Sequence, residues 1–273
     1  MRLHGICIVK NEGDIMRLFL EEASRWFDAV YVYDTGSTDD TWEKVLSVAR
    51  TNPKVVPFAK ESVAFKDSLR LHVFNHFRNR ARAGDWWCRL DADEVYAEDP
   101  KRFLAEVPCH HHVVWSIHLS YYLTPSDLKR FSPKDFEQPP EMTAETLPKH
   151  YVANSSEPRF FRHRDRLVWD HGAWPTHVGV VHPRRILLKH YQYRSPAQID
   201  LRLKTRAEAK AGGHPDFDYI KAKHWREALA SEDKLLVDNG GSYAIDESAL
   251  PRHLERPVHR FAKLAMHSLG LWP

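Results

Sequence analysis

Cysteine is scarce in this chain, and long apolar runs are absent. Three cysteines occur among 273 residues, and two of them, Cys7 and Cys88, lie in predicted core strands. This usage is typical of reduced thiols in an intracellular protein. A membrane span needs about 20 consecutive apolar residues, and no window of the sequence approaches that length. The apolar stretch 3–9 is too short for a secretory signal. We therefore expect a cytoplasmic protein.

A strong excess of charge of one sign is also lacking. The 40 Lys and Arg residues nearly balance 37 Asp and Glu residues, which leaves a formal net charge of +3. Basic and acidic residues are interspersed until the C-terminal third, whereas a nucleic-acid-binding domain concentrates its basic side chains on one face. We expect no nucleic-acid partner. The length suits one large domain, or one domain with an appendage.

Apolar strands alternate with amphipathic helices over the first 90 residues. The pattern predicts strands over 3–9, 28–33, 54–58 and 86–90, separated by helices over 14–26, 39–50 and 67–83. Repeated strand-helix units of this length predict an α/β fold whose central sheet is mostly parallel and flanked by helices.

The pattern changes after residue 98. A helix is predicted over 99–107, a strand over 112–122, a long loop over 124–158, and shorter strands over 159–162, 167–170 and 184–191. A loop of that length is usually functional or mobile, and we expect it to overhang the strand ends. We divide the chain into a domain over 1–195, with halves 1–98 and 99–195, and a helical C-terminal extension over 196–273.

Two carboxylates follow the fourth predicted strand at the spacing i, i+2. Asp91 and Asp93 come directly after the buried run 86–90, and Glu94 follows them. Ligands of open α/β sheets bind beyond the carboxyl ends of the strands. Divalent cations such as Mg²⁺ are held there by one or two carboxylates together with substrate phosphates. The spacing predicts a metal and diphosphate site, although these acids could also form only a solvated turn before the helix that starts at Asp99-Pro100.

Three segments together resemble a family 2 glycosyltransferase of the GT-A fold. They are Ile8-Val9-Lys10-Asn11-Glu12, then Val32-Tyr33-Asp34-Thr35-Gly36-Ser37-Thr38-Asp39-Asp40-Thr41, then Arg78-Asn79 followed by Gly84-Asp85-Trp86 and Leu90-Asp91-Ala92-Asp93-Glu94. The resemblance covers the first 95 residues or so and is thinner beyond residue 100. It implies a Rossmann-like GT-A sheet and a nucleotide-sugar donor, with a UDP-sugar favoured.

The resemblance also implies roles for single residues. The donor would be contacted by Val9, Lys10, Asn11, Glu12, Asp34, Arg78, Asn79, Asp91, Ala92 and Asp93. Asp34 would bind the base, and Asp91 would face the ribose directly or through the metal shell. Asp93 would bind Mn²⁺ or Mg²⁺, which would stabilise the charge on the leaving diphosphate. His190, at the end of a predicted strand, fits a late metal ligand and suits Mn²⁺ better than Mg²⁺. Because the chain has 18 histidines, most of them must have other roles.

The sequence does not single out one residue as the catalytic base. An inverting transfer needs a group that takes the proton from the acceptor hydroxyl. Related sequences often carry a His-Glu pair here, but Thr176-His177-Val178 has no glutamate. Asp170 and His177 are the candidates, with Glu157 behind them. Asp170 could instead only shape a turn with His171.

The sequence thus predicts a metal-dependent, inverting glycosyltransferase. Its acceptor would be a hydroxyl of a glycan, a lipid-linked or a small molecule, with surface polysaccharides among the products. One alternative is a catalytically silent nucleotide- or sugar-binding protein, which the missing glutamate near His177 favours. Another is a sugar nucleotidyltransferase, which the single glycine in the stretch 10–14 disfavours. The basic, amphipathic tail 257–272 could lie on the inner face of an anionic membrane or pack on its own domain.

Overall fold

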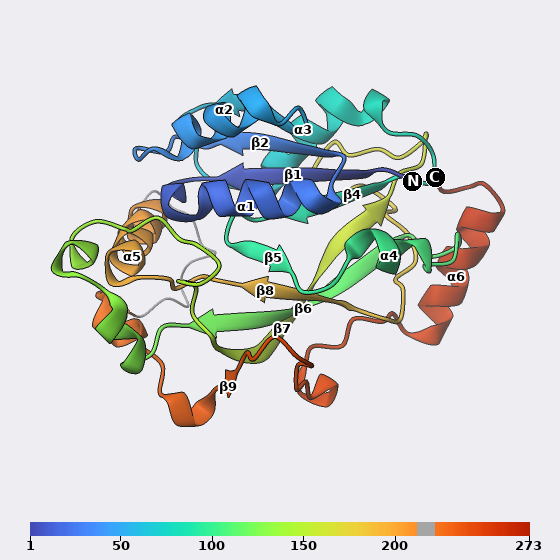
Figure 1. Ribbon diagram of the computed structural model, residues 1–273. Coiled ribbons are helices and arrows are strands. Elements are labelled where there is room, and N and C mark those ends of the chain that lie inside the picture. The colour runs from blue at the N-terminus through green and yellow to red at the C-terminus, as the bar shows by residue number, and fades with distance from the viewer. Residues whose placement is uncertain (212–221) are drawn as a thin grey trace.

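A computed structural model describes residues 1–211 and 222–273. Within that part of the chain, one continuous sheet holds strands in the order β3-β2-β1-β4-β7-β6-β8-β5, and β9 pairs with β7 (Figure 1). The strands are β1 Leu3–Val9, β2 Ala29–Asp34, β3 Val55–Lys60, β4 Trp86–Leu90, β5 Glu94–Tyr96, β6 Val113–Tyr122, β7 His150–Arg162, β8 Ile186–His190 and β9 Leu236–Val237. The α-helices are α1 Gly13–Trp26, α2 Thr41–Thr51, α3 Arg70–Phe77, α4 Pro100–Ala105, α5 Pro196–Ala211 and α6 Pro257–Ser268.

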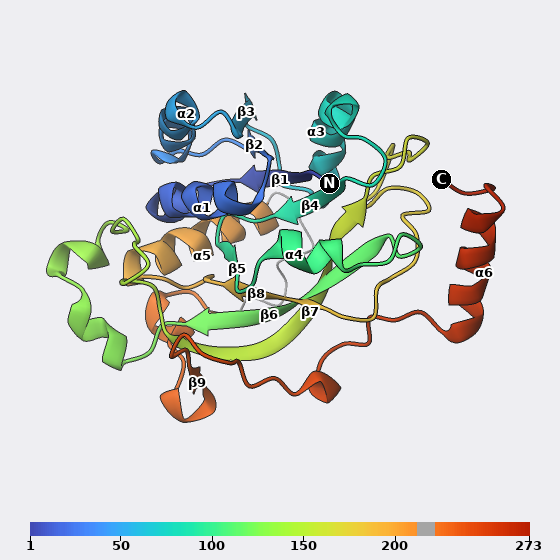
Figure 2. The same ribbon diagram turned by 45° about the vertical axis from the view of Figure 1, so that its right-hand side comes forward.

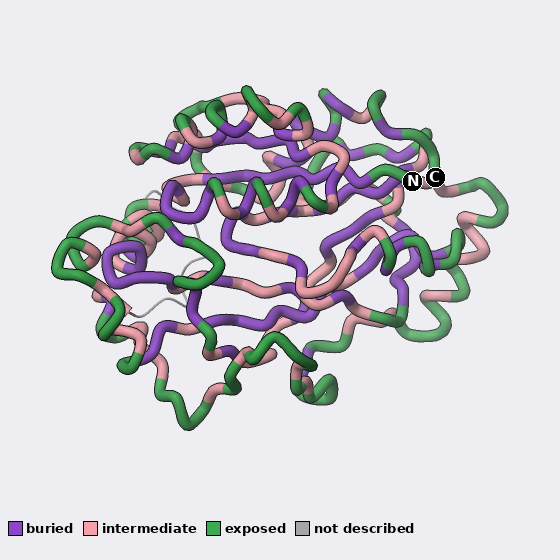
Figure 3. Tube along the Cα trace, in the orientation of Figure 1, coloured by how far each residue is buried: buried purple, intermediate pink, exposed green. Residues whose placement is uncertain are grey.

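Helices cover both faces of the first four strands. Along β1, Leu3, Cys7 and Val9 pack in one apolar cluster with α1 and α2, whereas Ile6 and Ile8 pack in another with α3. Successive side chains of a strand point to opposite faces, so a strand buried on both faces must be apolar throughout. Figure 3 shows this as a buried layer along the central strands beneath exposed helix surfaces. The predicted α/β fold is confirmed.

The sheet becomes mixed beyond β4. The strands β1 to β4 pair in parallel, as predicted, but β7 runs antiparallel to both β4 and β6. β6 and β8 are parallel, and β5 is antiparallel to β8. Parallel pairing, as predicted, therefore holds throughout β1 to β4 and again between β6 and β8, whereas β7 and β5 pair antiparallel with their neighbours.

The predicted loop 124–158 contains the first nine residues of β7. The polar composition of this segment predicts a loop, yet residues 150–158 form a strand because they pair with β6. Pairing with a neighbouring strand decides strand formation more than local propensity does. Pro158 is accommodated where the register with β6 shifts, as expected for a proline inside a sheet. The predicted strand 167–170 is wrong, since Val168 forms only an isolated bridge with Thr176.

The C-terminal extension is helical only in part. Two helices, α5 and α6, are present, but residues 222–256 hold only short 3₁₀ turns and β9. Figure 2 shows α6 standing at one end of the molecule, apart from the sheet. Among the described helices, none has both the length and the apolar character that a membrane span requires.

Candidate active site

The carboxyl ends of β1, β2 and β4 meet at one edge of the sheet. The parallel register pairs Val9 with Asp34 and Cys7 with Leu90, so the residues that follow these strands are neighbours. A cavity of about 910 Å³ opens there, which is within the range of small-molecule sites. It is lined by residues 8–12, 64–66 and 91–94 and by Arg89, His118, Glu157, Arg159, His190, Arg202, Thr205, Arg206, Glu208 and Ala209.

Asp34 is fully buried beside the cavity wall. Its Oδ1 accepts hydrogen bonds from the backbone N–H groups of Gly36 (2.8 Å) and Ser37 (2.6 Å). Gly36 has φ +94°, which a glycine adopts without strain. The Ser37 hydroxyl in turn accepts from the backbone of the cavity residue Asn11. Asp34 Oδ2 is buried without a hydrogen-bond partner in the described chain. A buried carboxylate oxygen in that state is unfavourable, so a donor on a ligand would stabilise it.

Three arginines surround Asp91. Its carboxylate lies 2.5 Å from Arg70 Nη2, 3.0 Å from Arg159 Nη1 and 3.8 Å from Arg89 Nε. Burial opposes ionisation, but these guanidiniums, Arg70 foremost, hold the pKa of Asp91 well below its usual range. Asp91 is therefore an anion whose main effect is to gather positive charge at the end of β4.

Asp93 is held by a residue of the C-terminal extension. Its Oδ2 lies 2.9 Å from Arg202 Nη1 and 3.3 Å from His190 Nε2. Burial opposes ionisation here too, and Arg202 and His190 overcome it, so the pKa of Asp93 is well below its usual range. Arg202 also bonds Glu12 at 2.9 Å. Through Arg202, helix α5 closes the cavity against the ends of β1 and β4.

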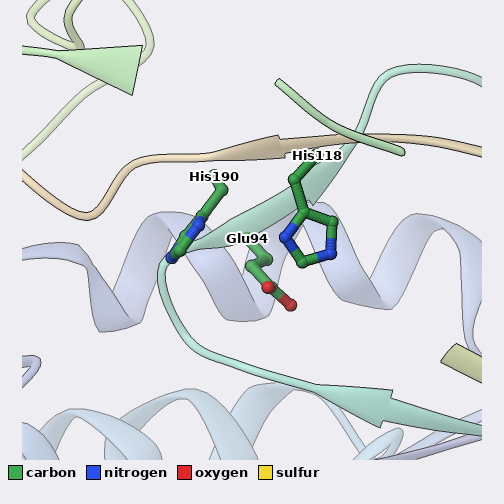
Figure 4. Close-up of side chains that lie close together, drawn as sticks. All are labelled: Glu94, His118 and His190. Carbon is green, nitrogen blue, oxygen red and sulfur yellow. The ribbon is translucent and has the colours of Figure 1, made fainter. Parts of the chain in front are cut away.

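Glu94, His118 and His190 converge from three different strands or strand ends (Figure 4). One ligand atom of each lies within 4.8 Å of the others. Glu94 and His190 are register partners in β5 and β8. His118 Nε2 accepts a hydrogen bond from Arg159 Nε at 3.3 Å, and burial lowers the pKa of His118 well below its usual range, so the ring is neutral. Glu94 pairs with Arg159 through Oε1, while its buried Oε2 has no hydrogen-bond partner in the residues described.

The divalent metal that the resemblance implies fits these side chains. Glu94, His118 and His190 place one ligand atom each close enough together for a single ion, and Asp93 Oδ2 lies 3.3 Å from His190 Nε2. Mn²⁺ accepts carboxylate oxygens and imidazole nitrogens, and nitrogen ligands favour Mn²⁺ over Mg²⁺. The partnerless Glu94 Oε2 is a ligand atom with no other role in the described chain. A cation bound to Asp93 would have to share this carboxylate with the Arg202 guanidinium or displace the guanidinium from it.

Most predicted donor-binding residues lie at the cavity. Val9, Lys10, Asn11, Glu12, Asp91, Ala92, Asp93 and His190 line it, and Asp34 lies behind it. Arg78 and Asn79 are not among the lining residues. They lie in the 3₁₀ turn Arg78–Arg80 at the far end of α3, where Arg78 donates to the carbonyl of Asp165. Arg70, at the start of α3, makes the contact with Asp91 instead.

The two candidates for the base do not lie at the cavity. Because β7 is antiparallel to β4, the chain after Arg162 emerges at the opposite edge of the sheet. There Asp170 is exposed and bonds only its neighbour His171 among the described contacts, and His177 stacks on Trp272 at 4.0 Å between ring centroids. Glu157 does line the cavity, with its Oε2 3.8 Å from Arg159.

Sequence reasoning missed His118, Arg159, Arg70 and Arg202. His118 had a weak signal, since it is a histidine inside an apolar β-forming run. The arginines had none, because their roles depend on the pairing of β4, β6 and β7 and on the position of α5.

No family model matches this sequence, and no curated protein matches it either. Solved structures do match. A mannosyltransferase of Pyrobaculum calidifontis in complex with GDP-Man and Mn²⁺ has a TM-score of 0.42 and 17% identity, covering 79% of this chain and 65% of its own. TarS of S. aureus with UDP-GlcNAc has a TM-score of 0.34 and 16% identity, covering 50% and 38%. A glucosyl-3-phosphoglycerate synthase of Mycobacterium tuberculosis with Mn²⁺, UDP and phosphoglyceric acid has a TM-score of 0.28 and 16% identity, covering 47% and 46%.

The chain thus spans less than two thirds of the length of each of these three structures. Because the identities are below a fifth and the TM-scores below 0.5, we take no ligand, substrate or activity from these structures.

Proposed function

We propose that this chain is a metal-dependent glycosyltransferase that moves a sugar from a nucleoside-diphosphate donor, with UDP favoured, to an acceptor hydroxyl. One observation carries the proposal. Asp91 and Asp93 line one cavity that is large enough for a nucleotide sugar, and Asp34, the register partner of the lining residue Val9, is buried beside it. The partnerless Oδ2 of Asp34 suits a hydrogen-bond donor on the base, as the N3–H of uracil is.

The charges at the cavity suit a diphosphate together with a cation. Six lysines and arginines and six carboxylates line it, so an anion alone would upset the balance and a metal-bound diphosphate would nearly keep it. Asp93 and His190, whose Oδ2 and Nε2 lie 3.3 Å apart, would hold the metal, with Glu94 and His118 next to His190 as further ligands. The bound ion would stabilise the negative charge of the leaving diphosphate. Arg89, Lys10 and Lys66 would supply further positive charge to phosphate oxygens.

We further propose Glu157 as the base for an inverting transfer. It is a carboxylate of the cavity wall whose side chain is 43% exposed, so an acceptor hydroxyl can reach it. An inverting reaction needs the base on the face of the sugar opposite the leaving diphosphate. Glu157→Gln should lower the rate of transfer about a hundredfold or more while leaving donor affinity unchanged. Asp170→Asn, outside the cavity, is the matched control and should transfer at the wild-type rate.

The test of the proposal is thermal unfolding against UDP, GDP, dTDP and CDP, each with Mn²⁺ or with EDTA. A ligand at 100 times its Kd stabilises by about 2.7 kcal/mol, which raises the midpoint by several degrees in a chain of this size. We expect one diphosphate to raise the midpoint only with metal, and Asp93→Asn to abolish the shift. No shift with any nucleotide would contradict the proposal.

The same preparation separates the alternatives. A silent binding protein would show the shift but neither transfer nor hydrolysis of the matching nucleotide sugar. A nucleotidyltransferase would form a nucleotide sugar and pyrophosphate from a nucleoside triphosphate and a sugar phosphate. We expect neither outcome, because a carboxylate lies in the cavity for acceptor activation and only one glycine occurs in the stretch 10–14.

A further inference from the structure

Helix α6 presents large apolar side chains to solvent. Within the helix, Val258 is 76% exposed and Phe261 73%, and no residue of the helix is buried. Leu269 (72%) and Leu271 (64%), directly after the helix, are exposed as well. Val258, Phe261, Ala262, Ala265 and Leu269 follow the spacing i, i+3, i+4, i+7, i+11, so they form one stripe along the helix. Figure 2 shows the helix standing beside the body of the protein, with one flank away from it.

The face of α6 that touches the body is mainly polar and basic, with one half-buried leucine, Leu264, at the spacing i+4 from Arg260. Arg260 Nη2 lies 2.7 Å from His111 Nε2, and Lys263 Nζ donates to the carbonyl of Gly179 at 3.2 Å. His267 packs against His112 with ring centroids 4.5 Å apart. A surface helix of a globular protein normally turns its apolar stripe to the core. Here the orientation is reversed, which leaves the apolar stripe available to something outside the molecule.

The charges around the stripe indicate which kind of partner it binds. Residues 251–273 contain four arginines and lysines and a single acidic residue, Glu255, which Lys263 already neutralises. Arg256 and His259, at the start of the helix beside Val258, are exposed, and Arg252 is exposed in the segment that precedes the helix. An apolar stripe bordered by basic side chains complements an anionic bilayer. The apolar side chains enter the boundary of the acyl chains, and the arginines bind headgroup phosphates. In a dimer built on the same strip, two basic borders would repel each other.

We propose that α6 docks this protein on an anionic membrane surface. The proposal does not depend on the glycosyltransferase assignment. It also fixes an orientation. The helix touches His111, His112 and Gly179 at the edge where β6 begins, whereas the cavity lies at the opposite edge, where β1 and β4 end. A chain docked through α6 keeps its cavity directed away from the membrane.

Sedimentation with lipid vesicles tests the docking. We expect the full chain to bind vesicles that contain phosphatidylglycerol, to release them at high salt, and to bind pure phosphatidylcholine vesicles weakly. Phe261→Ser with Leu269→Ser should lower the partition coefficient about tenfold or more, because two apolar side chains no longer enter the bilayer. The matched control is Leu46→Ser with Phe136→Ser, a leucine and a phenylalanine exposed elsewhere, which should bind as the wild type does.

Two further measurements keep the result unambiguous. The substituted side chains of α6 are largely exposed, so the thermal midpoint of the double variant should equal that of the wild type. Equal binding to both kinds of vesicle, no binding to the anionic ones, or wild-type binding by the double variant would overturn the proposal. So would a dimer, detected by analytical ultracentrifugation, that the double variant breaks, because the second copy would then be the occupant.

Discussion

At the scale of single residues, Asp34 has a buried carboxylate oxygen, Oδ2, that has no hydrogen-bond partner in the described chain. In Asp34→Asn, the amide oxygen can still accept from Gly36 and Ser37, while an NH₂ group replaces the partnerless Oδ2. In the wild type, that oxygen would accept a hydrogen bond from an N–H group of the nucleotide base. In the variant, the amide NH₂ group would face the same N–H group, and two donors cannot form a hydrogen bond. We expect the Kd for the nucleotide, measured by calorimetry, to rise about tenfold with little change in the thermal midpoint. A loss of stability with unchanged affinity would mean that Asp34 only shapes its loop.

His4 makes the stability of the protein depend on pH. Burial, partly offset by Asp85, lowers the pKa of His4 from 6.5 to about 4. A histidine that is neutral in the folded state binds fewer protons there than in the unfolded chain. Its contribution is therefore complete above pH 6.5 and is lost as the pH falls toward 4. Urea unfolding should show the wild type losing about 2 to 3 kcal/mol more than His4→Gln between pH 7 and pH 4. Parallel losses in the two proteins would contradict this assignment.

Single residues at strand ends could be predicted from the sequence, and residues brought in by distant strands could not. Asp34, Asp91 and Asp93 follow apolar runs directly, so their common edge depends only on the parallel pairing of neighbouring units. Arg159 reaches Asp91 because β7 is antiparallel to β4, and no local pattern carries that direction. The same reversal takes Asp170 and His177 to the far edge, away from the cavity.

At the scale of elements, α5 acts on the site through Arg202. The guanidinium lies 2.9 Å from both Asp93 Oδ2 and Glu12 Oε1, so it occupies the electrostatic place that a cation on Asp93 would take. In Arg202→Gln this competing charge is gone. We expect Mn²⁺ without nucleotide to bind about tenfold more tightly in electron paramagnetic resonance titrations, since like charges a few ångströms apart repel by more than 1 kcal/mol in a partly buried site.

A matched control comes from the same helix. Lys204 is exposed on α5, so Lys204→Gln removes a positive charge without touching Asp93 and should leave Mn²⁺ affinity unchanged. If Arg202→Gln bound Mn²⁺ no better than the control, the metal would not share Asp93 with Arg202, and the donor set proposed for it would need to change.

At the scale of the whole molecule, the predicted division at residue 195 separates parts that hold each other. Across it, Arg202 of α5 lies 2.9 Å from Asp93 and 2.9 Å from Glu12. On the same helix, Ile199 and Leu203 pack with Leu123 and Trp225 in one apolar cluster. Burial of side chains of this kind contributes about 2 kcal/mol each. We therefore expect α5 and Trp225 to unfold together with the sheet, and α6, which has no buried residue, to contribute little to that unit.

We accordingly expect the full chain to unfold in urea in one transition, with the same midpoint by far-ultraviolet circular dichroism and by tryptophan fluorescence. Truncation after residue 256 removes α6 and should change the free energy of unfolding by less than about 1 kcal/mol, because only exposed and half-buried side chains are lost. Truncation after residue 195 exposes Leu123 and removes the partner of Asp93, so it should lower the midpoint severely or prevent folding. Two separate transitions in the full chain, or a stable 1–195 fragment with the wild-type midpoint, would instead establish the extension as an independent domain and would make its contact with Asp93 an interface between domains.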